Sequence, residues 1–188
     1  MEQGEAFLTT RSEEETAYIG MVLGKWIKEP LVIALHGGLG TGKTVLVRGA
    51  AAGLGVTEMV TSPSFVLLKI YAGRLPVYHF DFYRLDEDVS LDDLGFDEYL
   101  PGEGVAFVEW AENLPGIIPP QRLEITIERF FDHGGEGRRI WFNPHGEESA
   151  WLVARLIEGI SWRVDGSLKM LPQSLFSLEF LGRLGWNC

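Results

Sequence analysis

The sequence predicts a single α/β domain in which helices flank a central mixed β-sheet, and three observations lead to that prediction. The chain has 188 residues, a length that suits one well-packed domain. Hydrophobic residues make up 46% of it and charged residues 23%, so a folded core is expected rather than disorder. Unbroken apolar runs at 31–35 and 105–108 lie among segments of helical periodicity, a pattern typical of parallel strands covered on both faces.

The first helix is predicted to begin after Ser12 and to end before Pro30. Ser12 and Glu15 have the spacing of a capping box, whose two side chains satisfy backbone N–H groups at the start of a helix. Apolar pairs then recur at four-residue intervals between 18 and 27, which places them on one face. The helix is therefore expected to pack that face against the core.

The later elements are predicted from apolar runs bounded by turn residues. In chain order they are a strand at 31–35, a helix from Lys43 to the glycines at 53 and 55, a loop at 61–64, strands at 65–71 and 76–81, a short acidic helix from Ser90 to about Leu100, a strand at 105–108 that ends at Glu109, strands at 123–129 and 138–142 around a turn at 132–137, and a helix at 147–160. We expect the sheet to be mostly parallel beside the turn before Lys43 and antiparallel toward the last two strands.

The formal net charge of −11 argues against a broad surface for gripping the phosphates of a nucleic acid. Much of this charge is local, because the segment from Asp81 to Glu112 holds eleven acids and only one base, Arg84. We interpret the segment as a solvated face, and an acidic docking surface for a basic partner is the alternative.

Cysteine usage and the absence of long apolar runs indicate the compartment. Cys188, the last residue, is the only cysteine, so no intrachain disulfide can form and a reducing environment fits. The first residues lack the pattern of a secretory signal, and no run approaches membrane-spanning length. We therefore expect a cytoplasmic protein with no membrane partner.

The most informative motif is Gly37–Thr44, which fits G-x-x-x-x-G-K-[ST] between a predicted strand and a predicted helix. Glycines let successive backbone N–H groups face one concavity, and the helix N-terminus adds its dipole. Lys43 would reach the β- and γ-phosphates of a nucleoside triphosphate, and Thr44 would provide one of the few protein ligands of Mg²⁺. The motif predicts a single P-loop NTPase domain.

Such a site also needs an acid, usually at the carboxyl end of a neighbouring strand. Two predicted strands end in this way, at Asp81 and at Glu109. Ser62 or Ser64 is a candidate sensor of the γ-phosphate, with a turn-stabilising role as the alternative. His79 is interpreted mainly as a structural strand residue, with a polar role in the site as the alternative. The chain has no Asn-Lys-x-Asp motif for guanine, which favours adenine.

Four blocks in a fixed order carry a resemblance to a known family: Gly37–Thr44 followed by Val47-Arg48-Gly49, Thr61–Phe65, His79–Leu85, and Val108-Glu109-Trp110. Order and spacing over about residues 12–145 resemble the bacterial TsaE family, ATPases of tRNA threonylcarbamoyladenosine biosynthesis. The block His79–Leu85 is far more discriminating than the phosphate loop.

The resemblance implies a role for each matching residue. It implies Lys43, Asp81 and Glu109 as catalytic residues, with Thr44 and Glu109 at Mg²⁺ and Asp81 as the acid needed for hydrolysis. It implies nucleotide contacts by Glu13, Leu39, Gly40, Thr41, Gly42, Lys43, Thr44 and Arg138, and it places Trp110 beside the site. The cofactors expected from it are ATP and Mg²⁺.

The resemblance also implies a purpose. Family members work with the TsaD and TsaB proteins, and their ATPase cycle supports the modification of adenosine 37 in tRNA, so contact with tRNA is expected only through the complex. One alternative is a small-molecule kinase, which would need a lid bearing several arginines, whereas the chain offers the pair Arg138-Arg139 but no such cluster. Another is a nucleotide-gated binding module in which hydrolysis is incidental.

The sequence departs from the family in two places. Gly38 stands where the family usually has Asp, so hydrolysis could be altered. The chain also continues past the usual end, and we expect residues 1–158 to form the ATPase domain and 159–188 an extension of unknown role. The extension holds ten large apolar residues between Leu168 and Trp186, too many for a solvated tail. We expect them to pack on the domain away from the nucleotide, with docking on a partner as the alternative.

Overall fold

The computed structural model describes residues 6–85, 95–96, 99–100, 102–162 and 168–169. Its elements are β1 (Ala6–Thr10), α1 (Glu13–Trp26), β2 (Leu31–His36), α2 (Lys43–Gly53), β3 (Leu68–Tyr71), β4 (Val77–Asp81), β5 (Val105–Glu109), the 3₁₀ helices η2 (Ala111–Asn113) and η3 (Pro115–Ile117), β6 (Arg122–Asp132), β7 (Gly135–His145), α4 (Glu147–Gly159), β8 (Ser161–Trp162) and β9 (Leu168–Lys169). None of the helices in these residues combines the length and hydrophobicity that a bilayer crossing requires.

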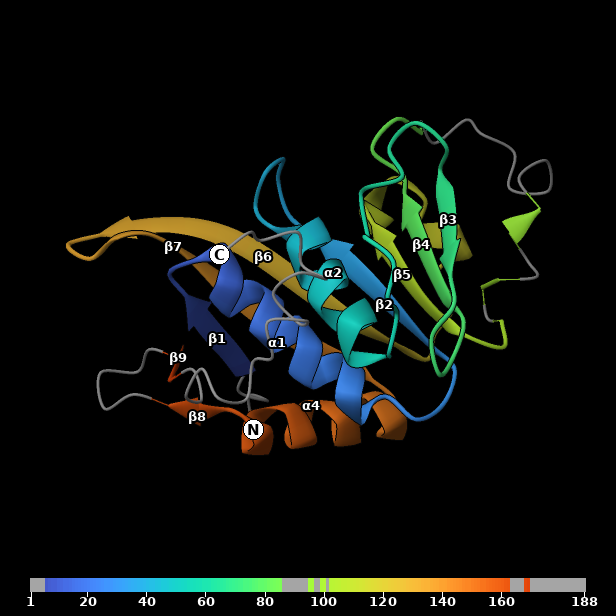
Figure 1. Cartoon of the computed structure of the whole chain (residues 1–188). Coiled ribbons are helices and arrows are strands. Elements are labelled where there is room, and N and C mark those ends of the chain that lie inside the picture. Colours follow the sequence, from blue (N-terminus) through green and yellow to red (C-terminus); the bar gives the residue numbers. More distant parts are fainter. Residues whose placement is uncertain (1–5, 86–94, 97–98, 101, 163–167, 170–188) are drawn as a thin grey trace.

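A seven-stranded mixed sheet forms the centre of the fold, in the order β1-β7-β6-β2-β5-β4-β3 (Figure 1). Strand β2 pairs in parallel with both β5 and β6, and β4 pairs in parallel with β5. The pairs β6–β7, β1–β7 and β3–β4 are antiparallel. The predicted fold class, an α/β domain with a mixed sheet, is confirmed, with the parallel part at the centre and antiparallel pairs toward both edges.

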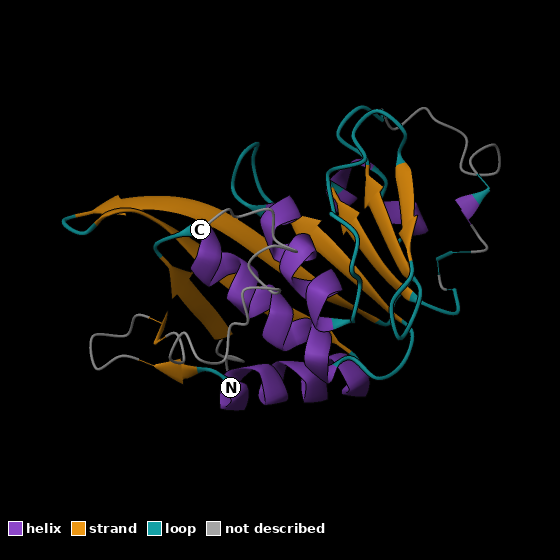
Figure 2. Ribbon diagram, viewed as in Figure 1, coloured by secondary structure: helices purple, strands orange, loops and turns teal. Residues whose placement is uncertain are grey.

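Helices α1, α2 and α4 lie together on one side of the sheet (Figure 2). Helices α1 and α2 approach each other closely at glycines: a Cβ placed on Gly49 would lie 2.0 Å from the carbonyl oxygen of Ala17. The N-cap of α1 is Ser12, whose side chain accepts a hydrogen bond from the backbone of Glu15, as predicted. The partner of the Glu15 carboxylate differs from that of a standard capping box: it accepts a hydrogen bond from the N–H of Arg11, at 2.6 Å, instead of from the N–H of Ser12.

The two faces of the central strands are both buried, but against different partners. One face packs beneath the helices and carries side chains such as Ile33, Leu35 and Phe107. The opposite face carries Val32 and Phe80 with the segment around η2 and η3. Burial on both sides explains why these strands are continuous apolar runs in the sequence.

Several boundaries differ from the sequence-based expectation. Strand β3 begins at Leu68 instead of residue 65, because the carbonyl of Pro63 accepts hydrogen bonds from the N–H groups of Val66 and Leu67, which fold as a turn. Strands β6 and β7 run to residues 132 and 135, so the predicted turn at 132–137 is far shorter. Strand β1 was not predicted, since a short edge strand has no two-sided apolar run.

Two expectations concern residues with little or no description in the structure. The acidic helix expected from Ser90 to Leu100 lies mostly outside the described residues. Of the C-terminal extension, only the paired strands β8 and β9 are described, with β9 close to β1. Residues 163–167 and 170–188, which hold nine of the ten large apolar residues, lie outside the described residues, and the packing of the extension stays a prediction.

Candidate nucleotide-binding and hydrolytic site

The phosphate-loop motif joins the end of β2 to the start of α2, as the sequence predicts. Gly37 has φ +129°, and a Cβ there would lie 2.3 Å from the carbonyl oxygen of Ile127, so a larger residue would not fit against β6. Gly42 is the N-cap of α2 with φ +108° and supplies no capping side chain. The first N–H groups of α2 therefore remain available to an anion. Leu39 is 75% exposed on the same loop.

Lys43 is buried within its own loop. Its Nζ donates to the carbonyl oxygens of Gly37 and Gly38, the latter at 3.0 Å, and lies 4.0 Å from the ring centroid of Trp110. Burial lowers the pKa of Lys43, and three nearby carboxylates, led by Glu109, act in the opposite direction. The ammonium is thus held beside the loop by an aromatic face and two carbonyls, in an acidic surrounding.

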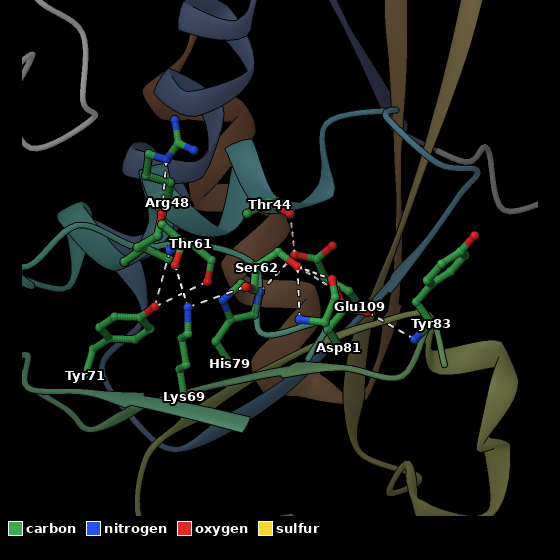
Figure 3. A network of polar contacts seen from close by, with 12 residues as sticks. Thr44, Arg48, Thr61, Ser62, Lys69, Tyr71, His79, Asp81, Tyr83 and Glu109 are labelled. Atoms are coloured by element: carbon green, nitrogen blue, oxygen red, sulfur yellow. Dashed lines mark hydrogen bonds and ion pairs between the residues drawn. The ribbon is translucent and has the colours of Figure 1, made fainter. Parts of the chain in front are cut away.

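The side chains of Thr44 and Glu109 are hydrogen-bonded at the carboxyl ends of the parallel strands. The Thr44 hydroxyl donates to Oε1 of Glu109 at 2.8 Å, and Nε2 of His79 lies 2.8 Å from the same oxygen (Figure 3). Glu109 is 3% exposed and His79 is fully buried. The contact to Thr44 arises because β2 and β5 are parallel neighbours, so the end of β5 lies beside the loop that follows β2.

Asp81 lies beside Glu109, because the two residues are register partners at the ends of β4 and β5. The Asp81 carboxylate accepts hydrogen bonds from the hydroxyls of Ser62 and Ser64, each at 2.6 Å, and from the N–H of Tyr83 at 3.0 Å (Figure 3). Ser62 and Ser64, predicted as alternatives, thus both reach the same carboxylate. The three donors fix the orientation of the buried Asp81 carboxylate.

The segment that carries Ser62 and Ser64 is tied to its neighbours on both sides. Lys69 of β3 donates to the hydroxyl of Thr61 at 2.5 Å, and the N–H of Thr61 donates to the hydroxyl of Tyr71 at 3.3 Å. On the other side, Arg48 of α2 donates to the carbonyl of Val60 at 3.3 Å. The segment therefore connects the helix after the phosphate loop with the sheet edge at β3 (Figure 3).

Arg129 of β6 is a site residue that the sequence did not predict. Its Nε donates to the carbonyl of Gly40 at 3.1 Å, which places the guanidinium against the phosphate loop. Glu136 lies between Arg129, at 3.6 Å, and Arg138, at 3.0 Å. Arg138, expected near the nucleotide, is therefore connected to the loop indirectly, through the side chains of Glu136 and Arg129. Arg129 reaches the loop because β6 pairs with β2, which lies far from it in the sequence. No local sequence motif around Arg129 therefore marks it as a site residue.

Glu13, a weaker candidate contact, is exposed on the first turn of α1. One turn later, the Cγ2 of Thr16 lies 3.7 Å from a Cβ placed on Gly42, so the start of α1 borders the phosphate loop. At Gly38, a Cβ would meet only the methyl group of Thr41, at 3.9 Å. A Cβ at residue 38 would therefore make only ordinary van der Waals contact, and crowding at that atom does not account for the glycine.

The oxygen donors at this edge suit a Mg²⁺–nucleotide complex. The Thr44 hydroxyl and the carboxylates of Asp81 and Glu109 are hard ligands of the kind that Mg²⁺ prefers. In the described part of the chain, no group of three or more His, Cys, Asp or Glu side chains is arranged so that it could hold a metal ion by itself. Mg²⁺ keeps most of its shell as water and phosphate oxygens, so one hydroxyl and two carboxylates are a donor set that suits it.

Comparison with known proteins agrees with this geometry. The model of the family "Threonylcarbamoyl adenosine biosynthesis protein TsaE" matches residues 10–139. The TsaE protein of Bacillus subtilis is 40% identical over 148 residues, covering 78% of this chain and 90% of the relative. The TsaE protein of Treponema pallidum is 40% identical over 127 residues, covering 68% and 94%. The crystal structure of Bacillus subtilis YdiB superposes with a TM-score of 0.71 at 36% identity, covering 82% of this chain and 95% of that one.

The match extends over most of the phosphate-loop domain and includes every candidate site residue from Glu13 to Arg138. The two TsaE relatives are matched over 90% and 94% of their own length, each at 40% identity. The chain belongs to the TsaE family of threonylcarbamoyl adenosine biosynthesis proteins.

Proposed function

We propose that the chain is a Mg²⁺-dependent ATPase that supports the TsaD and TsaB proteins in the threonylcarbamoyladenosine modification of tRNA. The observation that carries the ATPase part is the 2.8 Å hydrogen bond between Thr44, at the end of the phosphate loop, and Glu109, with Asp81 as the register partner of Glu109. Membership of the TsaE family carries the role in tRNA modification.

Nucleotide binding is assigned to the loop and its border. The uncapped N–H groups at the start of α2 and the Lys43 ammonium would hold the triphosphate. Leu39 and Gly40 lie on the same loop, and Arg138 adds positive charge beyond Arg129. Glu13 lies in the first turn of α1, whose next turn borders the loop at Thr16, and is proposed as a weaker contact.

Hydrolysis is assigned to the acids at the strand ends. Thr44 and Glu109 would hold Mg²⁺, which when bound neutralises charge on the phosphates. Asp81, fixed by the hydroxyls of Ser62 and Ser64, would orient the water whose oxygen attacks the γ-phosphorus while the bond to the ADP oxygen breaks. Lys43 stabilises the negative charge of the transition state.

The acidic chain is suited to work on another protein. Its net charge of −11 opposes unaided binding to tRNA, whose phosphates are negative. We therefore propose that tRNA is reached only through the complex with TsaD and TsaB.

Two other functions are separable by experiment. A small-molecule kinase would transfer the γ-phosphoryl group to an acceptor. A nucleotide-gated module would use ATP to order the segment from Thr61 to Phe65, and the hydrogen bonds from Ser62 and Ser64 to Asp81 give that alternative a physical basis.

The deciding experiment measures ATP hydrolysis by the full chain alone, with candidate phosphoryl acceptors, and with a TsaD–TsaB pair. We expect Mg²⁺-dependent release of phosphate and a dependence of tRNA modification on the hydrolysing chain. Transfer of phosphate to an acceptor would instead show a kinase. Full support of modification by a variant that binds ATP without hydrolysing it would instead show a gated module.

A further inference from the structure

His79 occupies a buried position that the proposed hydrolysis does not yet explain. It lies in the middle of β4, opposite Phe107 of β5, and its side chain is fully buried. Residues two apart on a strand share a face, so His79 and Asp81 lie on the same side of the sheet. Polar side chains are seldom placed at such a position without a hydrogen-bonding role.

The hydrogen bonding of the imidazole is one-sided. Nε2 lies 2.8 Å from Oε1 of Glu109, and because a carboxylate only accepts, Nε2 carries the hydrogen. Nδ1 is buried and has no hydrogen-bond partner among the described residues. An apolar side chain of similar size would fill the space without leaving a buried nitrogen unpaired. The feature that distinguishes histidine here is therefore its bond to Glu109.

That bond acts on the carboxylate that also faces the phosphate loop. Oε1 of Glu109 accepts from His79 on one side and from the Thr44 hydroxyl at 2.8 Å on the other. Within the described residues, both hydrogen bonds to the carboxylate fall on this one oxygen. Glu109 has a flexible side chain, and two donors that converge on one oxygen restrict its rotamers.

We propose that His79 is a positioning residue that holds the Glu109 carboxylate against Thr44 and so prepares these two residues for Mg²⁺. The inference rests on the proposed function, because it assigns His79 to the metal-binding step of that site. Hydrogen-bond partners that orient metal-binding carboxylates typically change metal affinity by about ten- to a hundredfold when they are removed. His79 thus affects metal binding through Glu109 without touching nucleotide or water.

A matched pair of variants separates the donor from the volume. His79→Gln keeps an N–H donor near the position of Nε2, and His79→Met has a side chain of nearly the same length and volume without a donor. The melting temperature of each variant reports whether it is folded. His79→Asn, whose shorter amide falls short of Glu109, replaces the Met variant if that variant does not fold.

The readout is binding of Mn²⁺ in the presence of ATP, followed by the electron paramagnetic resonance signal of free Mn²⁺, with binding of a fluorescent ATP analogue in EDTA as the metal-free reference. We expect His79→Met to weaken Mn²⁺ binding about ten- to a hundredfold and His79→Gln to recover most of that loss. Metal-free nucleotide binding should be unchanged in both variants. Equal Mn²⁺ affinity for the folded Met variant and the wild type would overturn the proposal.

The wild-type chain provides a second test that requires no variant. Long-range ¹⁵N–¹H NMR of the histidine side chains should show His79 with hydrogen on Nε2, and this signal should shift when Mg²⁺ is added to the ATP complex. A signal unaffected by Mg²⁺ would count against the proposal. If the wild type itself binds ATP with no response to metal, the proposed function fails, whereas a metal-responsive wild type with an indifferent Met variant contradicts only the role of His79.

Discussion

The Lys43 side chain donates hydrogen bonds within its own loop and contacts the face of Trp110, so its environment is built around a charge. Lys43→Ala is expected to lower hydrolysis by about a hundredfold or more, because in the proposed mechanism the ammonium stabilises transition-state charge. The fold should persist, since the phosphate-loop lysine adds little to the core. Phosphate release and melting temperature measure the two effects, and Lys25→Ala, on the exposed side of α1, is the control. Wild-type turnover in the Lys43 variant would show that the site is wrongly assigned.

Asp81 and Glu109 are register partners, but they accept hydrogen bonds from different groups. We therefore expect alanine substitutions at the two positions to have different effects. Glu109 accepts a hydrogen bond from Thr44, the other proposed Mg²⁺ ligand. Glu109→Ala should therefore weaken the Mg²⁺ dependence of nucleotide binding, so that the factor by which Mg²⁺ raises nucleotide affinity falls about tenfold or more. Asp81 accepts from Ser62 and Ser64, so Asp81→Ala should lower mainly kcat. Nucleotide titrations at several Mg²⁺ concentrations, combined with steady-state kinetics, measure the difference. The same profile from both variants would refute this division of roles.

Residues whose chemistry depends on nearby sequence could be predicted, and residues brought in by distant pairing could not. Lys43 and Thr44 follow from a local motif, and Asp81 and Glu109 follow from the rule that parallel strands present their carboxyl ends at one edge. Arg129 reaches Gly40 only because β6 pairs beside β2, a contact across 89 residues of sequence. No pattern around residue 129 could have indicated this.

At the scale of elements, the same distinction separates central strands from edge strands. Strands β2 and β5 are buried on both faces and therefore stand out as apolar runs. Strand β1 forms one edge of the sheet, and the outer parts of β6 and β7 are exposed, so their extent depends on pairing with each other more than on composition. Their existence as a hairpin could be predicted, but their length could not.

The far end of the β6–β7 hairpin is held by an ion pair that predicts a pH dependence. Hydrogen bonds from Arg11 and from the N–H of Gly134 lower the pKa of Asp132 to about 2, from an ordinary value of 3.8. A lowered folded-state pKa stabilises the fold above the unfolded pKa, and that stabilisation is lost as the pH falls from about 4 to about 2. Because Asp132 is exposed, the effect is small.

Asp132→Asn should therefore lower the urea midpoint slightly at pH 7, and this deficit should shrink as the pH falls toward 2. Urea unfolding at a series of pH values measures this, with Glu58→Gln on an exposed loop as the control. A deficit of the Asn variant that persists undiminished at pH 2 would contradict the ion-pair explanation.

At the scale of the whole molecule, the site is formed at the edge where the parallel strands end, and the helices cover the sheet from one side (Figure 1). The sequence of the C-terminal extension offers no candidate residue for this site, since it contains neither an acid pair nor a glycine loop. Its described strands pair with each other, and β9 lies close to β1, the edge strand farthest from β3 in the sheet. That the whole extension packs on the domain away from the phosphate loop stays a prediction.

A chain shortened to end at Gly159 tests that packing. The extension carries ten large apolar residues whose burial stabilises whatever surface they cover, so the shortened chain should melt at a lower temperature or lose solubility. ATP binding should be retained, because the loop and both acids lie upstream. The measurements are the melting temperature and the nucleotide affinity, compared with those of the full chain. Unchanged melting with lost ATP binding would refute the placement, and unchanged values of both would favour docking of the extension on a partner.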